Sequence, residues 1–158
     1  MLCAMAAGCS ETKMSDEVKI DIPESFTAEI TKNKQSFCAD IQRDGNGSWS
    51  ASFTAPETVS GLKISLTAQE YTVASQGLTQ SLSVDKMPRG SIVGAIASCL
   101  DHAANSSDAE YSEDDGDILI SGEVPCGEYV LRTDKKGRLL SLTVSSDIYA
   151  EFDSEDKK

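Results

Sequence analysis

A candidate acid–base pair lies at Asp101 and His102, where a carboxylate directly precedes the single histidine of the chain. In hydrolase triads a carboxylate orients a histidine that activates a nucleophile, so the three side chains must converge. Adjacent residues on a helix project about 100° apart and cannot form such an orienting pair by themselves. The sequence also contains no GxSxG elbow, HExxH motif, P-loop or dinucleotide-binding fingerprint. We therefore predict that the protein is not an enzyme, and that His102 lies in the last turn of a helix or faces solvent.

Two other groups of residues could bind a metal ion, namely the cysteines and the acidic residues that follow the histidine. Cys38, Cys99 and Cys126 lack the spacing of a zinc site, and one histidine offers no second nitrogen ligand. We interpret them as ordinary thiols, of which at most one pair can form a disulfide. The acidic run SEDDGD within residues 105–117 lacks the alternating ligands and distant glutamate of an EF-hand loop. A solvated acidic loop is predicted there, with no metal and no cofactor.

The segment MLCAMAAGC at the start of the chain is apolar and rich in small side chains. Its end, Ala6-Ala7-Gly8-Cys9, resembles a bacterial lipobox, in which the cysteine thiol receives diacylglycerol before cleavage. On this interpretation residues 1–8 are a residual signal peptide and Cys9 is the lipidation site. Residues 9–19 then form a lipidated polar tether at the outer face of the cytoplasmic membrane, in a bacterial cell envelope. The alternative interpretation is a frayed terminus that contains an ordinary cysteine.

Charge and hydropathy limit the classes of partner. The chain has 14 Lys and Arg residues against 26 Asp and Glu, a net charge of −12. This charge repels nucleic-acid phosphates and anionic lipid headgroups, so no nucleic-acid partner is expected. No apolar run approaches the roughly 18 residues that span a bilayer. Any contact with a membrane is therefore predicted to be through covalent lipid only.

Apolar and polar residues alternate with a period of two from residue 25 onward, which is typical of strands with one buried face. The recurrence of this pattern predicts roughly ten strands. Short connections such as 44–47 and 134–137 contain glycine, which adopts the positive φ of tight hairpins. Hairpins join antiparallel neighbours. The predicted fold is mainly β (α+β), a curved antiparallel meander in one domain over residues 20–153, followed by a charged tail at 154–158.

Residues 91–104 break the strand pattern and predict the one long helix. Their apolar side chains recur at helical spacing, and Ser91 can cap the first turn. The predicted apolar stripe consists of Ile92, Val93, Ile96, Cys99, Leu100 and Ala103. Because Gly94 and the alanines have little or no side chain, another backbone or a ligand can approach the helix closely.

A sheet of this size has more apolar surface than one helix can cover. About ten strands make a sheet about 45 Å wide, whereas a helix of this length is about 21 Å long. Exposed apolar area costs about 25 cal/mol per Å², so we expect the sheet to curl into an incomplete barrel with the helix as its lid. Small inward residues such as Ala39 and Ala51 leave room for a hydrophobic cavity. The predicted lining is Phe26, Phe37, Trp49, Phe53, Leu66, Leu78, Leu82, Ile92 and Ile96. The alternative is a fully collapsed core.

The order of these elements resembles the outer-membrane lipoprotein carrier superfamily (LolA/LolB-like). The resemblance is carried by the early hairpin FTAEITKNKQSFCADIQ, the strand-corner-strand WSASFTAPETVSGLKISL and the lid-like helix after six strands. It covers roughly residues 25–152. It implies an incomplete antiparallel barrel with a helical lid over a hydrophobic cavity, and a cell-surface lipoprotein that binds a lipid or an acylated peptide. The alternative function is an envelope protein–protein interaction module without a lipid pocket.

Overall fold

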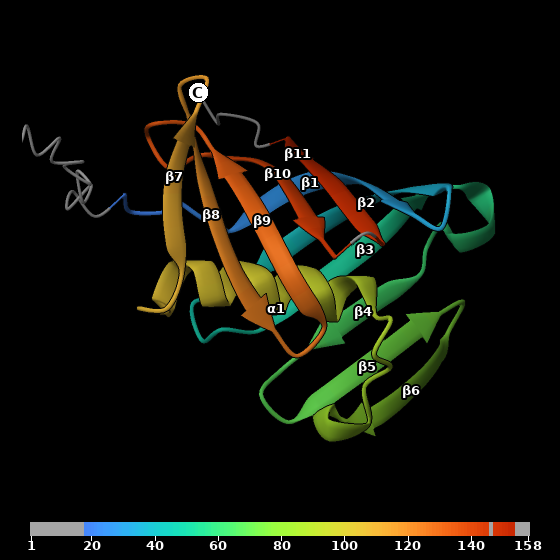
Figure 1. The fold of residues 1–158 in the computed structure, drawn as a ribbon. Coiled ribbons are helices and arrows are strands. Elements are labelled where there is room, and N and C mark those ends of the chain that lie inside the picture. Colours follow the sequence, from blue (N-terminus) through green and yellow to red (C-terminus); the bar gives the residue numbers. More distant parts are fainter. Residues whose placement is uncertain (1–17, 146, 154–158) are drawn as a thin grey trace, which may run out of the picture.

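The computed structural model describes residues 18–145 and 147–153, and it consists of one antiparallel sheet that curves around one long helix (Figure 1). The first six strands are β1 (Ser25–Lys32), β2 (Gln35–Arg43), β3 (Trp49–Ala55), β4 (Lys63–Leu66), β5 (Glu70–Ser75) and β6 (Leu78–Ser83). The helix α1 (Ile92–Asn105) follows. The last five strands are β7 (Glu110–Asp114), β8 (Asp117–Val124), β9 (Gly127–Thr133), β10 (Leu139–Val144) and β11 (Ile148–Asp153). Two short 3-10 helices, η1 (Glu57–Val59) and η2 (Val84–Lys86), lie in the connections.

The sheet has two halves, which we call wings. One wing is β1–β6, the other is β7–β11, and they meet where β1 pairs with β11. Its strand order is β6-β5-β4-β3-β2-β1-β11-β10-β9-β8-β7, and every neighbouring pair is antiparallel. The first and last strands are therefore neighbours, whereas the edges β6 and β7 are joined only through α1. The sheet is open, which confirms the predicted mainly β fold and the incomplete barrel.

The helix lies between the two wings rather than on one flat face. It contacts β3 and β4 of one wing and β8, β9 and β10 of the other (Figure 1). A helix on a flat sheet buries one stripe, but here Gly94, Ala95 and Ala97 are buried together with the predicted stripe, of which only Ile92 is half-buried. Ser91 caps the helix as predicted, because its hydroxyl oxygen accepts a hydrogen bond from the Gly94 N–H at 3.1 Å. The small residues of α1 thus let both wings close on it.

The strand alternation arises from burial on the face toward α1. Phe26, Ala28 and Ile30 of β1 are buried, while the residues between them are exposed. The register places Ala28 opposite Ala39 of β2, and both side chains are fully buried. These small side chains thus lie on the buried face at the centre of the sheet.

The sequence interpretation was wrong about the acidic stretch. Residues 105–117 do not form one loop, because the helix continues to Asn105 and β7 occupies Glu110–Asp114. All five residues of β7 are exposed, so this edge strand has no apolar alternation to reveal it. With β7, the described part of the chain has eleven strands rather than the expected ten.

Some sequence interpretations concern residues that the structure does not describe. The signal segment 1–8, the lipidation site Cys9 and the tail 154–158 lie outside the described residues. Within the described ranges, no helix is both long enough and apolar enough to cross a membrane.

Candidate functional site

A cavity of about 1030 Å³ lies at the C-terminal end of α1, between the helix, the strands β7 and β8, and the segment that precedes β1. Its lining consists of Val18, Lys19, Ile20, Asp21, Ile22, Arg43, Ala103, Ala104, Asn105, Ser106, Ser107, Tyr111, Ser112 and Ile118. Lys19, Asn105 and Tyr111 are among the lining residues that are exposed, so the cavity opens to solvent. Its volume is at the upper end of the range typical of small-molecule sites.

Residues 18–24, which we call the N-terminal strap, form one wall of this cavity. Val18, Ile20 and Ile22 pack against the hydrophobic core, while Lys19 and Asp21 between them are exposed. The strap is attached to both wings of the sheet. The Asp21 N–H donates to the Gly137 carbonyl oxygen at 3.0 Å, and the Glu24 carbonyl oxygen accepts from the Arg43 N–H at 2.8 Å.

Gly137 permits the close passage of the strap. It lies in the turn between β9 and β10 with a φ of 84°, a conformation that L side chains rarely adopt. A Cβ atom at this position would also collide with the Lys19 carbonyl oxygen. Glycine is therefore required both by the turn and by the strap beside it.

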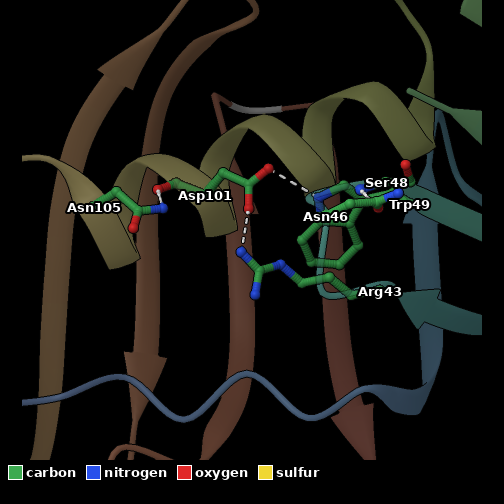
Figure 2. Close-up of polar contacts among 6 residues, drawn as sticks. All are labelled: Arg43, Asn46, Ser48, Trp49, Asp101 and Asn105. Carbon is green, nitrogen blue, oxygen red and sulfur yellow. Dashed lines mark hydrogen bonds and ion pairs between the residues drawn. The ribbon is translucent and has the colours of Figure 1, made fainter. Parts of the chain in front are cut away.

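A polar cluster of Arg43, Trp49 and Asp101 holds α1 to the ends of β2 and β3 next to the cavity (Figure 2). The Asp101 carboxylate accepts from Arg43 Nη2 at 3.1 Å and from Trp49 Nε1 at 2.9 Å. The Arg43 guanidinium also lies over the Trp49 ring, with Cζ 5.5 Å from the centroid. One carboxylate on the helix thus satisfies the indole N–H of the buried Trp49 and fixes the arginine.

Arg43 has hydrogen-bonding capacity left after this pairing. A guanidinium carries five N–H donors, and the Asp101 contact uses Nη2. Among the residues that the structure describes, Arg43 Nε is one of two buried side-chain polar atoms without a hydrogen-bond partner. The Arg43 side chain as a whole is 29% exposed, so its remaining N–H groups can donate to a polar group of a ligand at this wall.

The lining combines apolar and polar walls. Ile20, Ile22 and Ile118 provide aliphatic surface, and Lys19 and Arg43 provide positive charge. The Arg43 charge is partly balanced by Asp101, and Asp21 lies on the strap beside Lys19. This arrangement suits a molecule that is itself part apolar and part polar.

Asp101 and His102 face opposite wings of the sheet, as their adjacency on a helix predicts. Asp101 reaches β2 and β3, whereas His102 Nδ1 lies 2.8 Å from the Tyr129 hydroxyl of β9. His102 occupies the last turn of α1, as predicted, where it is half-buried. The two side chains therefore take part in separate contacts.

Cys99 of α1 and Tyr129 of β9 are protonated at neutral pH. Burial, with smaller contributions from Cys99 and Tyr111, raises the pKa of Tyr129 to about 12. Burial also raises the pKa of Cys99 far above its usual range, and the adjacent Cys126 thiol adds to the shift. Cys38, Cys99 and Cys126 are free thiols. In residues 18–145 and 147–153, no three His, Cys, Asp or Glu side chains gather as a metal site.

The structure places the nine predicted lining residues in three environments, and none of them lines the cavity described above. Phe26, Trp49, Phe53 and Ile96 are buried in the core. Phe37, Leu66, Leu82 and Ile92 are half-buried and pack against it. Leu78 is 78% exposed, so the prediction that it lines an enclosed cavity is wrong, because it lies at the start of the edge strand β6.

The buried aromatic residues pack against one another rather than around an opening. Phe26 makes edge-to-face contacts with Trp49 and Phe152, with ring centroids 6.5 and 5.4 Å apart. Phe37 and Phe53 form a similar pair at 6.3 Å. The role of these residues in ligand binding stays a prediction.

The residues that line the cavity were missed for identifiable reasons. The alternation of Val18, Ile20 and Ile22 was a signal in the sequence, but it lies beside the polar residues that were interpreted as a tether. Arg43 ends a predicted strand and carries no pattern of its own. Its position at the cavity depends on Asp101, far away in the chain.

No protein-family model and no curated protein matches the chain. Solved structures with a similar fold include an uncharacterized conserved protein from Thermus thermophilus, at a TM-score of 0.48 and 10% identity, covering 85% of this chain and 80% of that chain. They also include the LolA superfamily protein NE2245 from Nitrosomonas europaea, at 0.43 and 14%, covering 88% of both chains. A third is LprF from Mycobacterium bovis, at 0.38 and 14%, covering 83% and 84%. One of these three structures, NE2245, is a LolA superfamily protein, the superfamily that the sequence resembles.

Proposed function

We propose that the protein binds an amphipathic ligand, a lipid or an acylated peptide, in the cavity between the N-terminal strap and the C-terminal end of α1. The observation that carries this proposal is a cavity of about 1030 Å³ with aliphatic side chains on the strap and on β8 and two cationic side chains beside them. Apolar surface drives the burial of a ligand's hydrocarbon part, and a few polar groups fix its orientation.

The polar end of the ligand is proposed to meet Arg43. Arg43 lines the cavity and its side chain is 29% exposed, so a carboxylate or phosphate oxygen can accept from the guanidinium N–H groups that Asp101 does not use. The aliphatic chain would then lie along Ile20, Ile22 and Ile118. Binding, rather than catalysis, is the proposed activity.

Fluorescence titration with a fatty-acid probe tests this function. We expect saturable binding of one probe per chain and displacement by an unlabelled fatty acid. The fatty alcohol of the same chain length is expected to bind about tenfold more weakly, because it lacks the charge that pairs with Arg43. In the Arg43→Gln variant this preference for the acid should largely disappear. Absence of saturable binding to the folded wild-type protein would contradict the proposal.

We also propose that the chain is anchored at the outer face of the cytoplasmic membrane through lipid on Cys9, which the Ala6-Ala7-Gly8-Cys9 pattern supports. A protein with this anchor would partition into the detergent phase, and its mature N-terminus would be a diacylated cysteine. Mass spectrometry of the membrane-extracted native protein measures the modified terminus, and detergent-phase partitioning measures the anchor. An intact, unmodified chain upstream of Cys9 would rule out this anchor, without bearing on the cavity.

A further inference from the structure

The two edges of the sheet differ in how they are protected against pairing with another strand. The edge strand β7 has the sequence EYSED, with three acidic residues in five positions. The edge strand β6 has the sequence LTQSLS, which carries no charge and no proline. It pairs with β5 without a bulge, and among the strands of residues 18–145 and 147–153 it has no neighbour on its other side (Figure 1). Natural sheets usually block exposed edges with charges, prolines or bulges, so β6 has the features of a strand that pairs.

The geometry of the β5–β6 hairpin defines which backbone groups of β6 are free. The two turn residues, Gln76 and Gly77, have φ values of 49° and 82°, which is a two-residue type I′ turn. Ser75 and Leu78, which flank the turn, are therefore a hydrogen-bonded pair, and such pairs alternate along an antiparallel ladder. Leu78, Gln80 and Leu82 thus direct their backbone groups toward β5. Thr79 and Ser81 direct theirs outward.

The exposed strand is nearly palindromic about Gln80, since residues 78–82 read Leu-Thr-Gln-Ser-Leu. We propose that two copies of this chain associate by antiparallel pairing of β6 with β6, about a twofold axis at Gln80. Thr79 of each copy then lies opposite Ser81 of the other copy. Because the backbone groups of both residues point outward, the twofold axis produces two hydrogen-bonded pairs. Gln80 lies opposite its own equivalent in the non-hydrogen-bonded position.

The side chains favour this register over its neighbours. Leu78 lies opposite Leu82 of the second copy on the face that carries Tyr71, and this pairing covers a leucine that is 78% exposed in the single chain. A slip by two residues in either direction would place a leucine opposite Gln80. Cross-strand apolar pairs stabilise a sheet, so the register with two leucine pairs is selected.

Charge also favours a second copy only at this edge. Each chain has a net charge of −12, so two copies repel each other over most of their surface. When two copies pair through the uncharged β6, no like charges face each other across the two paired strands. Pairing through β7 would instead place acidic side chains of one copy opposite acidic side chains of the other. Added salt screens the remaining repulsion. Association through β6 should therefore strengthen as ionic strength rises.

Sedimentation or light scattering of the full chain tests the proposal. The wild-type mass is expected to rise with concentration from 16.9 kDa to twice that value, and to do so at lower concentration in high salt. Gln80→Lys places two positive charges at the axis and should leave a monomer at every concentration. Ser112→Lys on the exposed β7 edge is the matched control and should associate like the wild type.

A cross-link identifies the register. In a Gln80→Cys variant, mild oxidation should join position 80 of two copies, because residues that face each other in a non-hydrogen-bonded pair have closely spaced Cβ atoms. Trypsin releases this site in a peptide of residues 64–86, which contains no native cysteine, so its disulfide dimer is unambiguous. Ser112→Cys should give no such dimer across β7. A wild-type monomer up to about 1 mM, or association unchanged by Gln80→Lys, would overturn the proposal.

Discussion

Replacing Ala104 with tryptophan is expected to weaken the binding of a fluorescent fatty acid by about tenfold or more. Ala104 lines the cavity at the C-terminal end of α1, yet its own side chain is exposed. The indole would therefore occupy space that a ligand needs without disturbing the packed core, since substitutions at exposed sites cost little stability. Titration of the Ala104→Trp variant measures the effect, and circular dichroism checks the fold.

Two further variants make this result specific. Ser98→Trp lies on the same helix outside the cavity and should bind the probe like the wild type. Ile96→Trp probes the nine residues predicted from the sequence, because Ile96 is buried among them. Wild-type affinity in Ala104→Trp, together with lost affinity in Ile96→Trp, would move the ligand from the described cavity to the space beneath the helix.

Asp101→Ala is expected to lower the free energy of unfolding by about 2 kcal/mol, or roughly 5 °C in melting temperature. The substitution leaves the N–H of the buried Trp49 indole without its acceptor and removes the partner of Arg43. Most of the loss comes from the indole. The ion pair contributes less, because the Asp101 and Arg43 side chains are 38% and 29% exposed and solvent screens them. Thermal unfolding followed by circular dichroism measures the change.

The matched variants separate the hydrogen bond from the charge. Asp101→Asn retains an oxygen that can accept from Trp49 Nε1 and should lose less than half as much stability as Asp101→Ala. In a Trp49→Phe background, where no indole donor remains, Asp101→Ala should cost much less than in the wild type. Equal losses in both backgrounds would mean that the Trp49–Asp101 hydrogen bond contributes nothing.

The strands and the helix could be predicted because burial leaves a periodic trace in the sequence. β1 alternates since one face packs on the core, and α1 has a capping serine followed by an apolar stripe. β7 left no such trace, because both of its faces are exposed. Periodicity therefore identifies elements with one buried apolar face and misses an edge strand without one, such as β7, which is held by backbone pairing and by ion pairs of Glu113 and Asp114.

The cavity could not be predicted because it depends on residues distant in the chain. The comparison of sheet width with helix length correctly predicted that the sheet curves. It assumed, however, that α1 covers one face of the sheet, whereas α1 lies between the two wings. The structure shows a cavity at the C-terminal end of α1, where the strap passes beside Gly137. None of the nine predicted residues lines this cavity. The position of the cavity follows from one glycine and one arginine whose surroundings only the folded chain defines.

The pairing of β1 with β11 at the centre of the sheet has a consequence for the order in which the chain folds. Each wing is a succession of local hairpins, but Ala28 and Phe152 meet across nearly the whole described sequence. Closing so long a loop costs entropy before any contact compensates for it. The strands of each wing can therefore pair early and separately. The pairing of β1 with β11 forms only after the last strand emerges during synthesis. Until then both β1 and β10 present an unpaired side to the surroundings.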